Sequence, residues 1–370
     1  MSEVSNVSVR NLLYPGAKTK IYIHFMLWFG GKNHLDVGYN SSDPAVVARQ
    51  VAEMKQSGID GAIVDWYGKD EPNVEKATQV AKAEAERRGD FEIGICFDNG
   101  MFKHMPSGVN ANDYLITQIK YAKATYMASP MYMKAKDGRF LVSEFGMEGA
   151  PQAIDWNKIV SMFPEMAWLH RNKSGFPKPG AGAFSWLDSA NSSAAYLTDF
   201  INSAQQSYPT KLAMCSTWKG FDDRQAAWSK NRVVDGRNGQ LWLETWAALN
   251  AKWNATKQLD MLQLVTWNDY EEGTALEAGV ENGVVLLATA KAGVCTVEVT
   301  AGNTATIDHY EASVNGGPFV KLPGLELDLT QIEIEPGTYS VVFKAVGKGR
   351  VVNKLSNTVT AVARPVLVWS

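Results

Sequence analysis

The sequence of 370 residues lacks several features that would assign it to a class at once. Lysine and arginine total 36 and aspartate and glutamate total 39, so there is no excess of positive charge to attract nucleic acid. The chain has no apolar run of the ~18 residues that a membrane helix needs. Its three cysteines make no disulfide framework in a chain of this length. We therefore predict a globular protein, expected to be a monomer, with neither nucleic acid nor a membrane as partner.

Motifs of secretion, metal binding and nucleophilic catalysis are missing as well. The first residues, MSEVSNVSVRN, are polar and show no apolar segment of a signal peptide. Localisation is therefore left open, with a secreted or periplasmic protein expected if a leader was removed. The chain has no HxH, HExxH or CxxC spacing and no GxSxG. We predict no metal site and no cofactor.

Eight short apolar runs alternate with longer, mostly amphipathic stretches up to about residue 280. The runs are 21–28, 61–66, 91–98, 139–145, 166–170, 182–187, 211–217 and 261–269. They are nearly continuous in apolar residues, as parallel strands covered on both faces are. An open doubly wound sheet is the alternative, but LWFGGKNH after the first run lacks its GxGxxG turn. The pattern predicts an α/β fold, a (β/α)₈ TIM barrel over residues 1–280.

The pattern changes after about residue 283, where apolar and polar residues alternate with period two. Turn sequences NGG, LPG, EPG and GKG separate these segments. Such a pattern predicts an antiparallel β-sandwich, immunoglobulin-like or fibronectin-like, over residues 283–370. We interpret it as a spacer or a support for a lid. The alternative is a carbohydrate-binding or adhesion module, although Trp369 is its single tryptophan.

Carboxylates and aromatic rings stand where the predicted barrel strands end. In a TIM barrel the active site forms at this C-terminal rim. A sugar stacks its C–H face on aromatic rings and bonds carboxylates and amides through its hydroxyls. The rim therefore predicts a carbohydrate site. Its candidate substrate-binding residues are Trp28, Trp66, Tyr67, Trp186, Trp218, Trp267, Asn268 and Glu144.

The densest cluster of acids is TWNDYEEGTALE, residues 266–277. Asp269 and Glu272 are three residues apart, and they share one face if this loop turns into a helix. Hydrolysis of a glycosidic bond needs one carboxylic acid and a second carboxylate. The alternative is an acidic loop in which Asp269 caps a helix and the glutamates are solvated. Glu271 and Glu277 fit this alternative better.

Asp65 ends an otherwise apolar run, GAIVDW. Desolvation on one side tends to raise the pKa of such a carboxyl. The alternative is a salt bridge to Lys or Arg on a neighbouring strand end. We predict that Asp65, Asp269 and Glu272 converge in one pocket as catalytic carboxylates. Glu272 is the expected acid, and Asp269 is the expected base, kept ionised by amides at the start of the loop.

Three segments carry a resemblance to known enzymes. HFMLWFG, IDGAIVDWYG and VTWNDYEEGT resemble glycoside hydrolase families 71 and 99, related (β/α)₈ enzymes that cleave α-linked polysaccharides. The resemblance runs in order over residues 20–277. The last strand of family 71, the α-1,3-glucanases, ends in a WNDYGE-like motif. Trp267, Asn268, Asp269, Tyr270 and Glu272 match it, with Glu271 where glycine is usual.

The corresponding motif of family 99, the endo-α-mannosidases, resembles NEWHEGT. Glu272, Gly273 and Thr274 match it, and Asp269 stands where a glutamate is expected. The resemblance implies an endo-acting glycoside hydrolase, with α-1,3-glucan as the expected substrate. It implies inversion for family 71, and retention assisted by the substrate's own 2-hydroxyl for family 99. A family 99-like endo-α-mannanase and a non-catalytic carbohydrate-binding protein on a degenerate barrel are the alternatives.

Overall fold

The computed structural model describes residues 3–31, 33–207, 210–332 and 334–363. The chain divides into two compact units. The first comprises Leu13–Asp235 and Glu244–Glu277. The second comprises Met1–Leu12, Gly236–Leu243 and Ala278–Ser370. Trp369, the single tryptophan of the predicted sandwich, lies outside the described residues.

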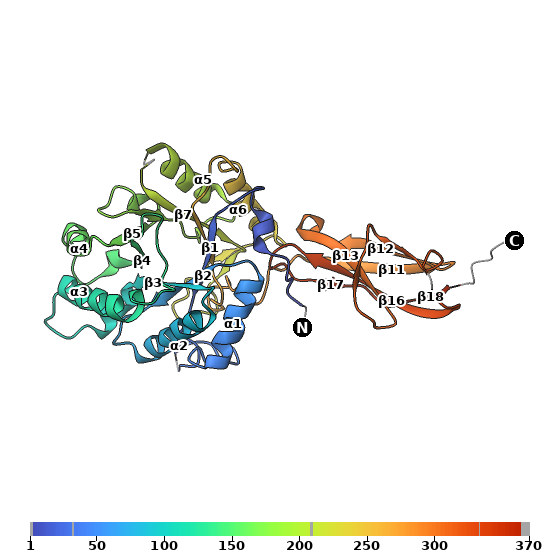
Figure 1. Cartoon of the computed structure of the whole chain (residues 1–370), viewed down its shortest axis with the longest axis horizontal. Helices are drawn as coiled ribbons and strands as arrows, with labels where there is room; N and C mark the ends of the chain where they lie inside the picture. Colours follow the sequence, from blue (N-terminus) through green and yellow to red (C-terminus); the bar gives the residue numbers. More distant parts are fainter. Residues whose placement is uncertain (1–2, 32, 208–209, 333, 364–370) are drawn as a thin grey trace. The chain divides into compact units, whose positions relative to one another are not determined.

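The first unit holds a closed barrel of parallel strands (Figure 1). Their spatial order is β1-β10-β7-β6-β5-β4-β3-β2. The strands are β1 (Lys20–Phe25), β2 (Gly61–Trp66), β3 (Glu92–Asp98), β4 (Phe140–Phe145), β5 (Met166–Arg171), β6 (Gly182–Phe184), β7 (Leu212–Trp218) and β10 (Met261–Val265). Each overlaps one of the eight predicted apolar runs. The prediction of a TIM barrel is therefore confirmed.

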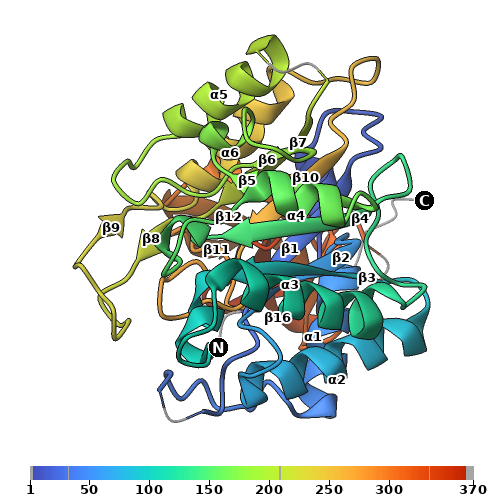
Figure 2. The same ribbon diagram turned by 90° about the vertical axis from the view of Figure 1, so that its left-hand side faces the viewer.

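Helices lie outside the barrel strands (Figures 1 and 2). They are α1 (Pro44–Gln56), α2 (Pro72–Arg88), α3 (Ala111–Ala122), α4 (Trp156–Met162), α5 (Ala195–Asn202) and α6 (Gln240–Asn250). α1 begins at residues typical of a helix start: Asp43 accepts a hydrogen bond from the Ala45 amide, and Pro44 takes the first helical position. In the described ranges, no helix combines the length and apolarity that crossing a bilayer requires.

A small antiparallel hairpin follows strand β7 and consists of β8 (Phe221–Asp222) and β9 (Val233–Val234). Figure 2 shows this hairpin at one edge of the barrel unit. The loop after β10 folds back on itself, since the Leu276 amide donates to the Thr266 carbonyl oxygen over 3.0 Å. The two loops adjoin, because the Asp222 amide donates to the Glu272 carbonyl oxygen over 2.8 Å.

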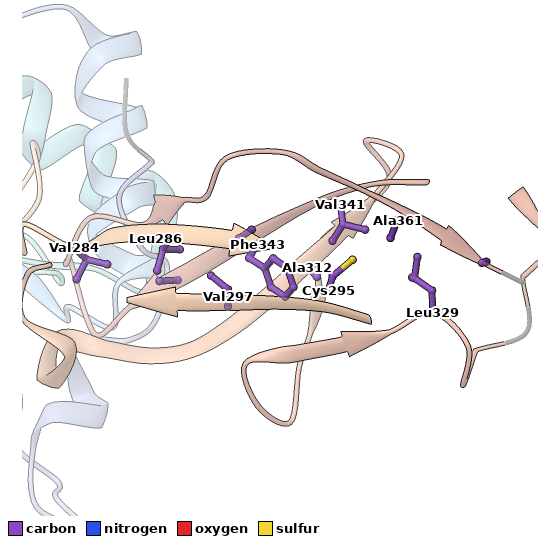
Figure 3. Packing of buried hydrophobic residues seen from close by; sticks show 12 residues of the cluster. Val284, Leu286, Cys295, Val297, Ala312, Leu329, Val341, Phe343 and Ala361 are labelled. Carbon is purple, nitrogen blue, oxygen red and sulfur yellow. The ribbon is translucent and has the colours of Figure 1, made fainter. Parts of the chain in front are cut away.

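The second unit contains two antiparallel sheets. One sheet consists of β11 (Val285–Lys291), β12 (Val294–Ala301) and β15 (Glu326–Asp328). The other consists of β13 (Ile307–Val314), β14 (Val320–Lys321), β16 (Gly337–Gly347), β17 (Lys354–Leu355) and β18 (Val359–Ala363). Alternate side chains, such as Cys295 with Val297 and Val341 with Phe343, form the core (Figure 3). The predicted β-rich C-terminal fold is confirmed.

Candidate active site

A cavity of about 600 Å³ is lined by residues at the C-terminal ends of the barrel strands and in the loops beyond them. It offers the volume of a typical small-molecule site. Six of the residues predicted from the sequence line it: Trp28, Asp65, Tyr67, Trp186, Asp269 and Glu272. All three predicted catalytic carboxylates are among them, so the fold brings together acids that stand over 200 positions apart in the chain.

Asp65 is a buried carboxyl at the end of β2. Burial, with a contribution from the charge of Glu272, raises the pKa of Asp65 from 3.8 to about 7, against a hydrogen bond with Tyr67. The His24 Nε2 atom lies 3.4 Å from Asp65 Oδ1. Burial lowers the pKa of His24 to about 3, so its imidazole is neutral. Within the part of the chain that the structure describes, Asp65 has this neutral His24 beside it and no salt bridge to Lys or Arg.

The Tyr67 hydroxyl lies among four carboxyl groups. Burial raises its pKa well above the usual value, and the charges of Asp98, Asp65, Asp269 and Glu272 act in the same direction. The phenol therefore keeps its proton and acts as a hydrogen-bond donor to Asp65. Burial and the charge of Asp65 also raise the pKa of Asp98 well above its ordinary range. The cavity thus holds more carboxyl groups than it can ionise together.

Asp269 is held in a tight turn rather than on a helix. Its Oδ1 accepts the Glu272 amide over 2.9 Å, and its own amide donates to Thr266 Oγ1 over 2.9 Å. The amide that bonds the carboxylate is thus that of Glu272, not one at the start of the loop. Burial and the charge of Glu272 outweigh this bond and raise the pKa of Asp269 well above its usual range, so the amide does not keep the pKa low as expected. The loop does not turn into a helix, so Asp269 and Glu272 do not share a helix face. The turn brings them together instead.

Glu272 is less buried than Asp269, and its pKa is also raised, chiefly by burial. Its Oε1 accepts a hydrogen bond over 3.2 Å from the indole nitrogen of Trp228, which opposes that rise. Trp228 lies between β8 and β9, lines the cavity and is 42% exposed. Sequence reasoning missed this residue. The available signal is that Trp228 stands alone in a polar segment, DDRQAAWSKN.

The loop that carries Trp228 is organised by the buried carboxylate of Asp223. This group accepts bonds from the amide of Arg232 over 2.8 Å, the Arg232 Nε atom over 2.8 Å and the Ser229 hydroxyl over 3.1 Å. Burial alone would raise the pKa of Asp223, but bonds from Arg232, Lys230 and Ser229 prevail and lower it to about 2. A carboxylate that stays ionised gives the loop a lasting anchor.

Three predicted sugar platforms do not line the cavity. Trp66 is completely buried; its indole donates to Glu75 Oε2 over 2.9 Å and its ring stacks with Tyr121. Because side chains alternate along β2, the inward direction of Asp65 sends Trp66 outward to the helices. Trp218 and Trp267 are completely buried too. The expectation of subsite platforms is corrected here: all three are packing residues, whereas Trp28 and Trp186 do line the cavity.

Asn268 and Glu144 also lie away from the lining. The amide side chain of Asn268 accepts from the Met26 amide over 2.9 Å and donates to the Met26 carbonyl oxygen over 2.8 Å. It therefore fastens the loop after β10 to the end of β1. Glu144 is fully buried with Oε1 3.1 Å from His170 Nδ1, and His170 Nε2 donates to the Pro179 carbonyl oxygen over 2.7 Å. As placed, both predicted substrate-binding side chains hold the scaffold.

One group of side chains in the described residues has the donor types of a metal site. The ligand atoms of His24, Asp65 and Cys96 lie within 4.8 Å of one another, and all three residues are buried. Burial raises the pKa of the Cys96 thiol well above its usual value. A metal binds the thiolate, so Cys96 would have to release this proton to act as a ligand. Of the three residues, His24 and Asp65 line the cavity.

No family model and no curated protein matches the sequence. Among solved structures, the chain is similar to a family 99 endo-α-mannosidase from Bacteroides thetaiotaomicron in complex with BIS-TRIS-propane. That match has a TM-score of 0.56 and 15% identity over 71% of this chain and 88% of that one. A second structure of a family 99 endo-α-mannosidase from this bacterium matches with a TM-score of 0.55 and 16% identity over 71% of this chain and 89% of that one. A glycoside hydrolase-like protein matches with a TM-score of 0.50 and 11% identity over 70% of this chain and 87% of that one. At these identities the likeness establishes the barrel fold.

Proposed function

We propose that this protein is a glycoside hydrolase that cleaves within an α-linked polysaccharide. The observation that carries the proposal is the meeting of Asp65, Asp269 and Glu272 in one cavity. Carboxylates that share a site in this way supply the acid and the base that glycosidic hydrolysis needs. The proposal is further supported by the aromatic side chains of Trp28, Trp186 and Trp228 in the same lining, since sugars stack on such rings.

Glu272 acts as the general acid in this proposal. Its carboxyl lines the cavity, and its raised pKa keeps the proton available at a higher pH than an exposed glutamate would allow. The proton passes to the glycosidic oxygen while the bond from that oxygen to the anomeric carbon breaks. Glu272 is left ionised, and the Trp228 indole N–H then stabilises the new carboxylate.

Asp269 acts as the base. In an inverting reaction it takes a proton from the water that attacks the anomeric carbon, and in a retaining reaction it takes one from the substrate's 2-hydroxyl. The raised pKa of Asp269 makes its carboxylate a stronger base. The same raised pKa means that the carboxyl must release its own proton before it can act. Asp65, hydrogen-bonded to Tyr67, stabilises positive charge at the anomeric carbon when it is ionised.

The proposed substrate is α-1,3-glucan, because the WNDY segment resembles family 71. An α-mannan is the second candidate, favoured by Gly273, Thr274 and the likeness of the barrel to the family 99 enzyme. Gly273 has φ +66°, and an added Cβ would lie 3.1 Å from the Asp222 backbone nitrogen. Glycine therefore allows the loop after β10 to pass close to the β8–β9 hairpin.

The test is the release of reducing ends from α-1,3-glucan, α-1,6-mannan and α-1,4-glucan. We expect the first to be cleaved, and the Glu272→Gln variant to lose activity by at least about a thousandfold. Glu298→Gln, an exposed position in β12, is the matched control and should keep full activity. Cleavage of the mannan instead would select the second candidate. Binding of a polysaccharide without any cleavage would leave the non-catalytic binding protein as the function.

A further inference from the structure

Glu271 is buried and uses both carboxylate oxygens to hold the segment that follows β1. Its Oε2 lies 2.8 Å from His34 Nδ1, and its Oε1 accepts the Leu35 amide over 3.0 Å. The sequence expectation that Glu271 is solvated is therefore wrong. At the position of Glu271 the family 71 motif usually has glycine, and the family 99 motif has histidine. This chain has a carboxylate there, and it fixes a loop at the cavity.

The His34 ring lies parallel to Trp28, with centroids 4.8 Å apart and an interplanar angle of 5°. Trp228 meets both rings edge-on, with centroids 6.1 Å from Trp28 and 6.2 Å from His34. All three rings line the cavity. They come from the end of β1, the segment after it and the β8–β9 hairpin. Two adjacent acids contact two of these rings: Glu271 pairs with His34, and Glu272 accepts a hydrogen bond from Trp228.

The bond to Glu271 also orients the His34 ring. A carboxylate only accepts, so Nδ1 carries the hydrogen that faces it. The Nε2 atom is then the ring nitrogen left for a ligand, as an acceptor in the imidazole and as a donor in the imidazolium. A ring face on the exposed Trp228 beside one oriented ring nitrogen suits a sugar ring, through its C–H face and a hydroxyl that can donate or accept.

We propose that Trp28, His34 and Trp228 form a subsite for one sugar ring of the polysaccharide, next to the carboxyl groups that do the chemistry and joined to them by the hydrogen bond from Trp228 to Glu272. Glu271 is its positioning residue, acting only through His34 and the loop it holds. The identity of the sugar rests on the proposed function; the subsite does not. On this view Glu271 contributes to the binding of a polysaccharide chain.

The subsite is tested by the length dependence of binding. The probes are α-1,3-linked glucose oligomers and α-1,6-linked mannose oligomers of increasing length, titrated calorimetrically into the Glu272→Gln variant so that they stay intact. Affinity should rise in a step at the length that first reaches the subsite. His34→Ala and Trp228→Ala, each added to that variant, should weaken binding about tenfold for oligomers of that length or longer. Shorter oligomers should bind as they do to the Glu272→Gln variant alone.

Milder substitutions separate the contributions. His34→Phe keeps a ring against Trp28 but loses the Nε2 atom, so we expect a smaller loss of about threefold. Glu271→Gln can still accept the Leu35 amide but no longer dictates the His34 tautomer, and it should behave like His34→Phe. His309→Phe, in strand β13, is the matched control and should bind every oligomer as the parent does.

Each outcome decides between the subsite and the proposed function. A step that persists in His34→Ala and Trp228→Ala, with melting temperatures unchanged, overturns the subsite while hydrolysis by the unmodified protein would still support the function. A step that these variants abolish, in a protein that cleaves none of the oligomers, supports the subsite and refutes the hydrolase. If neither series binds the Glu272→Gln variant or is cleaved by the unmodified protein, both proposals are wrong.

Discussion

The indole nitrogen of Trp228 lies 3.2 Å from Oε1 of Glu272 and donates a hydrogen bond to it. This bond connects a loop that projects from the β8–β9 hairpin with the turn after β10. It stabilises the ionised form of Glu272 and so opposes the effect of burial on the pKa of that group. Trp228 therefore influences the proposed acid as well as any sugar that it touches.

Replacing Trp228 with phenylalanine should shift the alkaline limb of the pH profile of kcat/KM to higher pH. The donated hydrogen bond lowers the pKa of Glu272, so its loss lets that pKa rise, and the acid keeps its proton further into the alkaline range. One hydrogen bond is worth about 1 kcal/mol, which corresponds to a shift of somewhat under one pH unit. Trp156→Phe, which changes a ring packed on Trp168, is the control. A limb that moves to lower pH would contradict this assignment.

The roles of Glu272 and Asp269 should separate with a substrate whose leaving group needs no proton. With an activated aryl glycoside, Glu272→Ala should recover most of its rate relative to the polysaccharide. Asp269→Ala should stay about a hundredfold or more below the parent, since the attacking oxygen would still lack its base. Rates on the two substrates give the comparison directly. The reverse pattern would exchange the two roles, and full activity in both variants would place the catalytic centre elsewhere.

The buried carboxyl of Asp65 should make the protein less stable as the pH rises. Its pKa is raised from 3.8 to about 7 on folding, so between these values the unfolded chain has released a proton that the folded chain still holds. The free energy of unfolding therefore falls with rising pH across this window and levels off above it. Relative to the parent, Asp65→Asn should gain roughly 2–4 kcal/mol between pH 4 and pH 8. Urea unfolding followed by tryptophan fluorescence gives this difference, and an equal response to pH in both proteins would refute it.

Trp66 and Trp186 should respond in opposite ways to substitution. Trp66 packs against the helices with its indole on Glu75, so Trp66→Phe should lower the melting temperature by several degrees and leave KM within about twofold. Trp186 lines the cavity and meets His24 edge-on at 4.8 Å, so Trp186→Ala should raise KM about tenfold. Thermal melts and initial rates on the polysaccharide test the pair. A raised KM in Trp66→Phe would mean that this ring does reach the substrate.

The barrel could be predicted because its signal is local. Each strand overlaps a short apolar run, and α1 starts at a capping aspartate followed by a proline. The seven residues of α4, in contrast, are too few to show a clear helical period. The alternating segments after residue 283 likewise predicted antiparallel strands, because one face of each is buried.

The sequence by itself determined which residue types arrive at the rim: Asp65, Asp269 and Glu272 follow from their positions at strand ends, since parallel strands present those ends on one side. Only the tertiary structure decided which residues next to these carboxylates in the chain also point into the cavity. Trp66 follows Asp65 yet faces the helices, because adjacent side chains of a strand point to opposite faces. Glu271 precedes Glu272 yet turns to His34, and Trp228 joins the site from a loop whose path depends on a buried Asp223. Such choices depend on contacts between segments far apart in the chain, and no local pattern records them.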